Sequence, residues 1–507
     1  MVCAVFGLLD MSKSLTERTA SGFIWSAAGS FGKAILQIAV ISVLAHLLEV
    51  QSFGVVQAAM VVVGFAKLIS MMGIGPALVQ RKEITQRHVR VGFTLSLSLG
   101  LILASGLFLF SDSFARLFSI EEIGFVLRVL SLLFLLESFV TVSSSLLQRD
   151  MRFKEIAMVD IISYFFGYGL VGVYLGFKGY EYWALIAAIF TQEIIKLAMY
   201  FKLKSHSLLP LWSKKEFKDL VHYGVGHTIA KIANFFTTQG DNFVVSRYLG
   251  AQQLGYYGLA FTLMVRPYSL IITALDKALF PALSKIQDDK EKLKHNFEIM
   301  IKILTLILIP VFLVLLILAE NIVFFLLGEK WAPAIVPFQI LTFGIIFRVT
   351  TRISDVLVRA VGDVYSRAWR RSISAVVMLI CCYIGQKYMG INGVALGVVF
   401  TNLVTCFLMA TLTFKHIKVS WMDYIKLYSK GMLLGLIFGA LLFSSKLWFE
   451  KLVDIHLLII IFSTSISVLI TIYVVIANKN FFISSEKEYI VFFLNRLKLS
   501  RLSKMLD

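Results

Sequence analysis

Uninterrupted apolar stretches of about 20 residues recur along this chain of 507 residues. A stretch of that length can cross the hydrocarbon core of a bilayer as a helix. Hydrophobic residues make up 58% of the chain and charged residues 16%, whereas soluble domains carry about a quarter charged residues. The apolar stretches are continuous and lack the alternation of a membrane β-barrel. The sequence therefore predicts an all-α, polytopic membrane protein.

Fourteen apolar segments mark the predicted transmembrane helices. They form two groups of six and a final pair, which predicts two pseudo-symmetric six-helix lobes followed by two C-terminal helices. The expected parts are a cytoplasmic N-terminus (1–19), a first lobe (20–201), a basic cytoplasmic connector (202–220), a second lobe (221–414), helices 13 and 14 (424–477) and a basic cytoplasmic tail (478–507). Residues 1–10 are expected to be an upstream extension, with Met11 the more natural start.

The distribution of Lys and Arg predicts the orientation of these helices. If the N-terminus is cytoplasmic, the cytoplasmic loops and adjoining helix ends carry 33 of these residues and the outer ones carry 7. This is the positive-inside bias of inner-membrane proteins, and it predicts that both termini face the cytoplasm. It also accounts for the net charge of +18, so no nucleic-acid partner is expected.

A short segment of the chain recurs 201 residues later. His46–Gly54 aligns with Arg247–Gly255, with the glycine at the end of each segment in common. Each copy lies between the first and second helix of its six-helix group. Since six is even, the two groups share one orientation and form parallel repeats about an axis along the membrane normal. Repeats of this kind predict an alternating-access transporter with its substrate site between the halves, although a duplication without a transport role is the alternative.

Enzyme signatures are absent from the sequence. It contains no phosphate-binding glycine–lysine loop, no HExxH motif and no GxSxG elbow, and its outer loops are short. Its four cysteines show no metal or redox spacing. We therefore expect no catalytic residue, no metal site and no cofactor. A membrane glycosyltransferase or polymerase is the less favoured alternative.

Ionisable side chains inside the predicted helices are the most informative residues, because each is costly in lipid unless it faces a polar interior. Basic residues outnumber acidic ones there by nine to six. Five helices place polar residues three or four positions apart, on one face. These faces predict a central hydrated cavity whose surplus positive charge suits an anionic substrate. The predicted substrate-binding residues are Lys33, Lys231, Arg266, Arg348 and Arg352.

Pairing between helices is the alternative explanation for these charges. Arg352, for example, lies three residues before Asp355, which is the spacing of an intrahelical ion pair. Lys196 and Arg128 lie near predicted helix ends, where their side chains are expected to extend to the membrane surface. The sequence alone leaves substrate binding and pairing both open.

Two acidic residues are the predicted ion-coupling sites. Asp241 and Glu137 lie on polar faces of their helices, where a carboxylate can exchange a proton or a sodium ion. The histidines show no metal-ligand spacing. His46, His88 and His206 lie at helix ends or in loops and are expected to be solvated.

Three segments of the chain resemble the polysaccharide flippases of the multidrug/oligosaccharidyl-lipid/polysaccharide exporter superfamily, which includes the MATE transporters. They are Gly73–Lys82, Gln148–Lys154 and, most strongly, Asp241–Tyr257. The chain looks most similar to exporters of the colanic-acid and teichuronic-acid type. The resemblance implies a MATE-like fold of two six-helix lobes plus two further helices. It also implies export of an anionic, undecaprenyl-diphosphate-linked oligosaccharide across the bacterial inner membrane, in exchange for H+ or Na+, with polysaccharide polymerase and export machinery as partners.

Two relatives of the same fold are the alternatives to this function. Drug exporters often carry an acidic residue in helix one, whereas helix one of this chain has Lys33 and no acidic residue. Lipid II flippases carry arginines in their first two helices, where this chain has Lys33 and Lys67 instead. Both departures favour an exporter of lipid-linked oligosaccharides.

Overall fold

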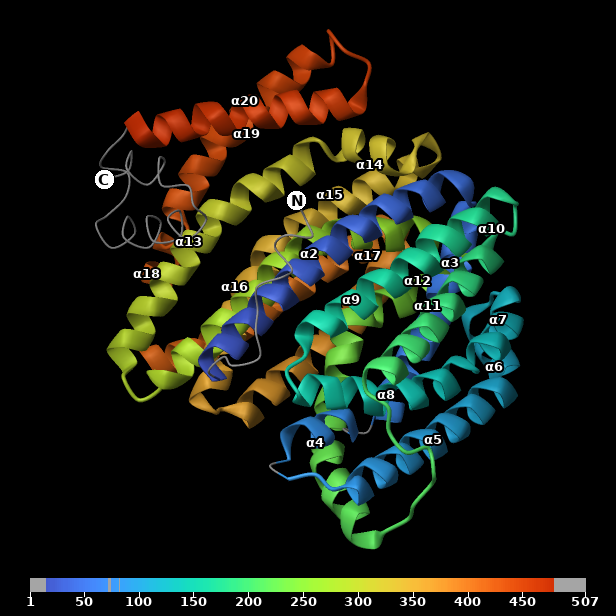
Figure 1. The fold of residues 1–507 in the computed structure, drawn as a ribbon. Coiled ribbons are helices and arrows are strands. Elements are labelled where there is room, and N and C mark those ends of the chain that lie inside the picture. The colour runs from blue at the N-terminus through green and yellow to red at the C-terminus, as the bar shows by residue number, and fades with distance from the viewer. Residues whose placement is uncertain (1–14, 72–73, 82, 478–507) are drawn as a thin grey trace. The chain divides into compact units, whose positions relative to one another are not determined.

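The computed structural model describes residues 15–71, 74–81 and 83–477. In these residues all regular secondary structure is helical, as the apolar sequence predicts (Figure 1). Ten helical stretches among them are long and apolar enough to cross a membrane. The chain divides into two compact units, the first comprising Met1–Gly258 and Ser269–Lys277, and the second comprising Leu259–Tyr268 and Ala278–Asp507.

The first unit begins with long apolar helices. Because lipid offers no hydrogen bonds, backbone amides are satisfied within such helices. Figure 1 shows α2 running beside α9, and α5 packs along α8. Its helices are α2 (Leu15–Leu47), α3 (Val50–Met71), α4 (Ile74–Gln80), α5 (Gln86–Leu109), α6 (Ser111–Phe118), α7 (Glu122–Leu130), α8 (Leu133–Arg149), α9 (Phe153–Tyr164), the π-helix η1 (Phe165–Gly172), α10 (Val173–Phe177), α11 (Tyr182–Leu203) and most of α12 (Lys214–Lys285).

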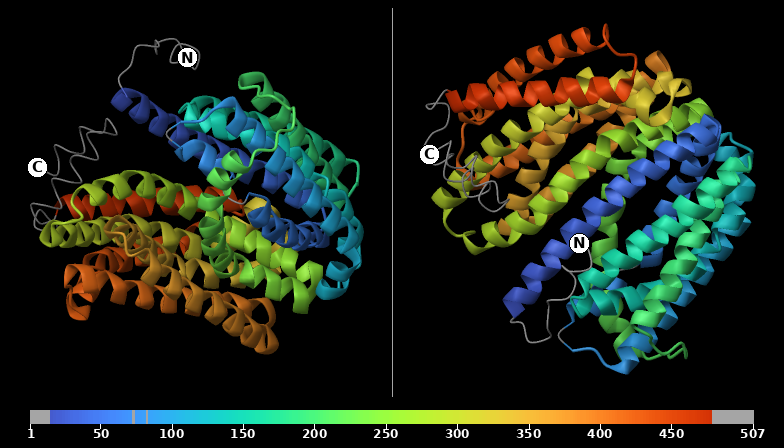
Figure 2. Two further views of the ribbon diagram at one scale, coloured as in Figure 1. Left: turned by 90° about the horizontal axis from the view of Figure 1, so that it is seen from below. Right: turned by 45° about the horizontal axis from the view of Figure 1, so that its top comes forward.

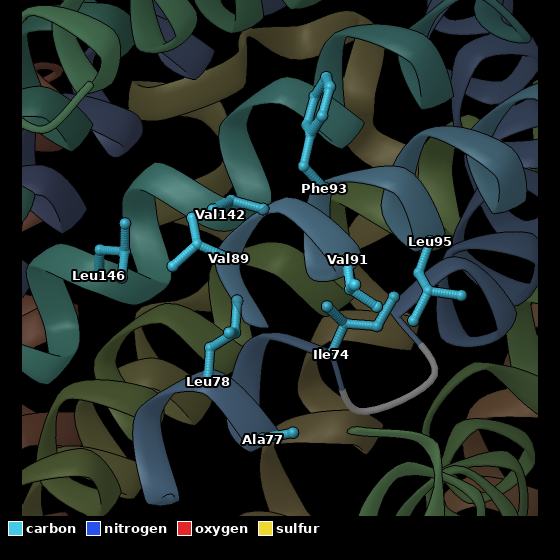
Figure 3. Close-up of a cluster of buried hydrophobic side chains, with 9 residues drawn as sticks. All are labelled: Ile74, Ala77, Leu78, Val89, Val91, Phe93, Leu95, Val142 and Leu146. Atoms are coloured by element: carbon cyan, nitrogen blue, oxygen red, sulfur yellow. The ribbon is translucent and has the colours of Figure 1, made fainter. Parts of the chain in front are cut away.

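A dry apolar cluster ties three helices of this unit together. Figure 3 shows Leu78 of α4, Val89 of α5 and Val142 of α8 in this cluster, and all three side chains are buried. Gly92 of α5 lies close to Leu78, where an added Cβ would be in van der Waals contact. Dispersion contacts of this kind hold helices together where lipid removes the hydrophobic driving force.

The second unit is built from the rest of the helices. In Figures 1 and 2, α19 and α20 run side by side, and α19 also packs along α13. Gly431 of α19 allows this approach, because a Cβ there would press on Thr305 of α13. The helices are α13 (Lys290–Ile317), α14 (Ala319–Leu327), the 3-10 helix η2 (Glu329–Ala334), α15 (Ile335–Phe343), α16 (Ile345–Val361), α17 (Val364–Ile417), α18 (Trp421–Lys426), α19 (Ser429–Phe449) and α20 (His456–Ala477).

Two long helices are each broken once. In α12 the break is at Gly250, whose φ is 82°. In α17 it is at Met389 and Gly390, and the φ of Gly390 is 57°. A helix of 54 residues would extend for about 80 Å, well beyond the thickness of a bilayer. In α17 the backbones of Gly385 and Gly393 touch, so the helix folds back on itself as a hairpin.

The described parts of the fourteen predicted segments lie mostly in helices, and some segments contain a turn, as at residues 131–132 and 427–428. The predicted connections at 247–254 and 389–390 fall on the breaks of α12 and α17, where the helical assignment continues through the turn. The number of membrane crossings and the lobe boundaries stay predictions. The expected N-terminal extension and the basic tail from residue 478 lie outside the described residues.

Candidate functional site

The two copies of the sequence repeat meet within the first unit. A Cβ on Gly54 would overlap the backbone of Ala251, and a Cβ on Gly255 would overlap the backbone of Val50. Positions 50 and 251, like positions 54 and 255, are equivalent in the repeat, so the contact is reciprocal. Gln57 touches Gly258, and these two positions are also equivalent to each other in the repeat. A two-fold relation between the repeats produces this pattern. We name this contact the glycine junction; it comprises Val50, Gly54, Gln57, Ala251, Gly255 and Gly258.

Several ionisable residues in the helices of the first unit form ion pairs. Lys33 of α2 lies 3.1 Å from Asp160 of α9, and Lys196 lies 2.6 Å from Glu193, one turn earlier in α11. The predicted coupling residue Glu137 of α8 pairs with Lys67 of α3, and both are partly buried. Charges removed from water need such partners.

The partners change what each predicted residue can do. An anion reaches Lys33 only in competition with Asp160, and a proton or sodium ion reaches Glu137 only in competition with Lys67. Lys196 and Arg128, which are expected to extend to the membrane surface, each lie beside a carboxylate. Lys196 is held by Glu193, and Arg128 lies 2.5 Å from Asp112 of α6. The Lys196–Glu193 pair is partly buried, whereas the Arg128–Asp112 pair is exposed.

Asp241 is buried in the first arm of α12, nine residues before the break at Gly250. Its carboxylate accepts a hydrogen bond of 2.7 Å from the Tyr257 hydroxyl and one of 2.8 Å from the amide of Asn242. Since Tyr257 follows Gly250 and Asp241 precedes it, the hydrogen bond links the two arms of α12.

The densest charge cluster lies in the second unit, around Asp355 of α16. Its carboxylate is fully buried and contacts four arginine side chains, which we name the arginine cluster. Arg367 binds it through two nitrogens, with Nε–Oδ1 at 2.6 Å and Nη2–Oδ2 at 3.3 Å. The other contacts are Arg359 at 3.3 Å, Arg371 at 3.4 Å and Arg352 at 3.6 Å.

The arginine cluster surrounds the turn between α16 and α17. Arg352 and Arg359 come from α16, and Arg367 and Arg371 from the first two turns of α17. Gly362, with φ of 84°, ends α16, and Asp363 caps α17 through the amide of Ser366. Hydrogen bonds from Ser366 and His416 lower the pKa of Asp363, which keeps this cap ionised. The turn therefore fixes the approach of the four guanidinium groups.

Two further predicted substrate-binding residues lie in the second unit. Arg348 is one turn before Arg352 in α16, and its guanidinium lies 5.1 Å from the centre of the Phe261 ring. Its Nε is buried and has no hydrogen-bond partner among the described residues. Arg266 lies in the second arm of α12, partly exposed. Lys231 is in the first arm of α12, and its side chain lies outside the described part of the structure.

Two of the three histidines expected to be solvated are covered by neighbouring side chains, so that expectation was wrong for them. His88 is buried at the start of α5, where its ring accepts from the amide of Thr85 at 3.3 Å. His206 packs against Phe93 and Phe201 and lies 3.0 Å from the Ser143 hydroxyl. Burial lowers the pKa of His206.

Sequence reasoning overlooked Arg367 and Arg371, which it counted as loop charges. The sequence did contain a signal for them. Both arginines follow Asp355 closely enough in the sequence that a short turn between two helices can bring their side chains to its carboxylate. His88 also had a signal, because Thr85 three residues earlier forms a capping box in which histidine replaces the usual Glu or Gln.

Apolar helices with ion pairs inside them and a duplicated segment define a membrane transporter fold. Two solved structures share it. The lipid II flippase MurJ in an inward closed conformation aligns with a TM-score of 0.70 at 17% identity, over 88% of this chain and 98% of that one. An inward-facing multidrug MATE transporter aligns with a TM-score of 0.63 at 17% identity, over 78% and 98%. The chain is a multi-pass membrane protein with a MurJ/MATE-like fold.

The chain belongs to the family described as polysaccharide biosynthesis protein, whose profile matches residues 43–337. The succinoglycan biosynthesis transport protein ExoT of Rhizobium meliloti is 30% identical over 64% of this chain and 64% of its own length. The lipopolysaccharide biosynthesis protein WzxC of Escherichia coli is 27% identical over 78% and 80%. The teichuronic acid biosynthesis protein TuaB of Bacillus subtilis is 24% identical over 66% and 70%.

Proposed function

We propose that this protein is a flippase that moves an anionic, undecaprenyl-diphosphate-linked oligosaccharide across the bacterial inner membrane for surface polysaccharide synthesis. The observation that carries the proposal is the family match over residues 43–337, together with relatives named for polysaccharide transport and synthesis. Such a cargo carries negative charge on its diphosphate. Cationic side chains inside apolar helices are suited to it, because they supply the charge that lipid does not.

The residues proposed to bind the cargo are the cations predicted from the sequence. Arg348 supports this assignment, since its buried Nε retains a hydrogen-bond donor without a partner among the described residues. Arg352 and Arg266 supply guanidinium forks, which suit phosphate oxygens, whereas Lys33 and Lys231 supply point charges. Lys33 would exchange Asp160 for the cargo as it binds.

Transport is proposed to proceed by alternating access. The chain would cross the membrane fourteen times, as two six-helix lobes and a C-terminal helix pair, with both termini in the cytoplasm. The glycine junction supports this scheme, because its contacts join equivalent positions of the two repeats. Exchange of H+ or Na+ at Glu137 or Asp241 would supply the driving force, and a polysaccharide polymerase would use the exported product.

Lipid II export is the second candidate function, and the MurJ fold favours it. Multidrug export is a third possibility with the MATE fold in its support. Both likenesses are at 17% identity, which indicates fold rather than cargo. Lys33 in place of an acidic residue in α2 argues against a drug exporter.

Deletion of the gene tests the cargo directly. We expect a lipid-linked oligosaccharide to accumulate on the cytoplasmic side of the inner membrane, with loss of one surface polysaccharide and normal peptidoglycan synthesis. Lipid II accumulating instead would move the assignment to the second candidate. Unchanged lipid-linked saccharides together with increased sensitivity to drugs would assign multidrug export.

A further inference from the structure

The basic connector between α11 and α12 is fastened to the first turns of α5, beside which it runs in green in Figure 1. Arg90 of α5 donates to the backbone carbonyl of Leu209 at 3.0 Å and to that of Pro210 at 3.3 Å. One turn further along α5, the Thr94 hydroxyl accepts a hydrogen bond of 2.8 Å from the amide of Leu211. Because its backbone groups are held in this way, the connector is a fixed part of the first unit.

These hydrogen bonds place the connector at the edge of an apolar helix. The stretch Gln86–Leu109 is long and apolar enough to cross a membrane, and beyond Arg90 it carries no charged residue. Thr94 lies four residues beyond Arg90, which is about 6 Å along the helix. The headgroup region on each side of a bilayer is about 5–8 Å thick. The connector is therefore bound to α5 at the depth of lipid headgroups.

The connector has one side on the protein and a second, exposed apolar side. Leu211 and Phe217 pack against the apolar cluster of α4, α5 and α8. Leu209 and Trp212 point outward and are 66% and 65% exposed. The ring centres of Trp212 and Phe217 lie 4.9 Å apart, so the indole is supported without being covered. Tryptophan in such a position is typical of the membrane–water interface, because its ring is apolar and its N–H is polar.

Positive charge adjoins these exposed apolar residues. Residues 202–218 contain five lysines and a single acidic residue, Glu216. Glu216 is buried and accepts a hydrogen bond from the Ser213 hydroxyl, whereas Lys214 and Lys215 are exposed. Lysines close to a membrane surface attract anionic phospholipids. The exposed side of the connector thus combines apolar side chains with positive charge, which is the chemistry of a segment that lies in the interface.

We propose that the connector is an interfacial membrane anchor, in which Leu209 and Trp212 insert between the headgroups of anionic phospholipids that Lys214 and Lys215 attract. The apolar side chains contribute affinity through the surface they bury, and the lysines contribute the preference for negatively charged lipid. The anchor would hold the end of α11 and the start of α12 at one depth in the bilayer. This role goes beyond the proposed function, because it does not depend on the cargo.

Fluorescence of Trp212 in the reconstituted full-length protein tests the anchor. The chain has seven tryptophans, so the difference between the wild type and Trp212→Phe isolates the Trp212 signal. Vesicles contain equal amounts of phosphatidylglycerol and phosphatidylcholine, one of which is brominated near the top of its acyl chains to quench a nearby indole. We expect brominated phosphatidylglycerol to quench the Trp212 signal about twofold more than brominated phosphatidylcholine, because the lysines enrich the anionic lipid.

Exchange of the lysines tests the preference for anionic lipid. In the double variant Lys214→Gln, Lys215→Gln, the two brominated lipids should quench the Trp212 signal equally. The double variant Lys285→Gln, Lys290→Gln is the matched control, because it removes the same charge from exposed residues of the second unit, and it should keep the preference. Each double variant is compared with its own Trp212→Phe form.

Two results would overturn the proposal. The first is a Trp212 signal that brominated lipid does not quench: quenching by aqueous acrylamide would then place the connector in water, and protection from both quenchers would show that another protein or a second copy covers it. The second is equal quenching by the two lipids in the wild type. Neither result would change which saccharide accumulates in the deletion strain.

Discussion

At the residue scale, several charges in the first unit lie in pairs, so the effect of each of them depends on its partner. Removing one member of a partly buried pair leaves the other without its partner, at a cost below the about 3–5 kcal/mol of a fully buried pair. We therefore expect Lys67→Met and Glu137→Gln each to lower thermal stability, and the double variant to lose less than the sum of the two. Thermal unfolding of the four proteins measures this. Strictly additive losses would show that the pair does not interact.

Transport by the same Glu137→Gln variant tests ion coupling. If Glu137 exchanges an ion, the variant should transport independently of an imposed proton or sodium gradient in vesicles. Asp241→Asn is the parallel test. If Asp241 instead has a structural role as the acceptor of the Tyr257 hydrogen bond, this variant should lower the stability of the protein. Unchanged gradient dependence in both variants would remove both carboxylates from the coupling mechanism.

His206 gives a pH dependence whose sign follows from its environment. Burial lowers its pKa, so the unfolded chain takes up a proton first as the pH falls below about 6.5. The stability that neutral His206 contributes is present above that pH and is lost on acidification. We expect the fall in melting temperature between pH 7.5 and pH 5.5 to shrink in His206→Gln. The exposed His46 provides the control, and an equal change in His46→Gln would refute the assignment.

At the scale of elements, the glycine junction sets how closely α3 and α12 approach. An added methyl group on Gly54 or Gly255 overlaps backbone atoms, and overpacking of this kind costs about 1–3 kcal/mol. We expect Gly54→Ala and Gly255→Ala to lower thermal stability by similar amounts, because the contacts are reciprocal. Gly106→Ala in α5 is the matched control, since nothing lies within 4 Å of its Cβ position. A loss in only one of the two junction variants would contradict the two-fold relation.

The helices were predictable from the sequence because the apolar stretches match the length that a bilayer requires. The sequence repeat predicts that Gly54 and Gly255 are equivalent positions. It does not predict the contacts that these glycines make, because sequence identity carries no information on distance. The pairing of Arg352 with Asp355 follows from helical spacing. The approach of Arg367 and Arg371 depends instead on the angle of the turn at Gly362, which sequence periodicity does not encode.

At the scale of the whole molecule, the topology is the prediction on which the direction of transport depends. The distribution of 33 cytoplasmic and 7 outer Lys and Arg residues predicts fourteen crossings with both termini inside. Reporter fusions should read as outside after Glu49, Gly250 and Lys451, and as inside after Glu83, Lys215 and Lys418. The fusions at Gly250 and Lys418 also test whether the broken helices α12 and α17 each cross twice. An inverted pattern in either half would overturn the topology.

The central claim is that the protein itself moves a lipid-linked oligosaccharide between leaflets. The most direct measurement reconstitutes the purified protein in vesicles that contain a fluorescent undecaprenyl-diphosphate oligosaccharide, and follows its exposure to a reagent that destroys only the outer-leaflet label. With protein present, the protected half of the label should become accessible within the assay, and an Arg348→Ala, Arg352→Ala variant that folds normally should slow this. Label that stays protected at the rate of protein-free vesicles, under an imposed proton gradient and under a sodium gradient, would contradict the account.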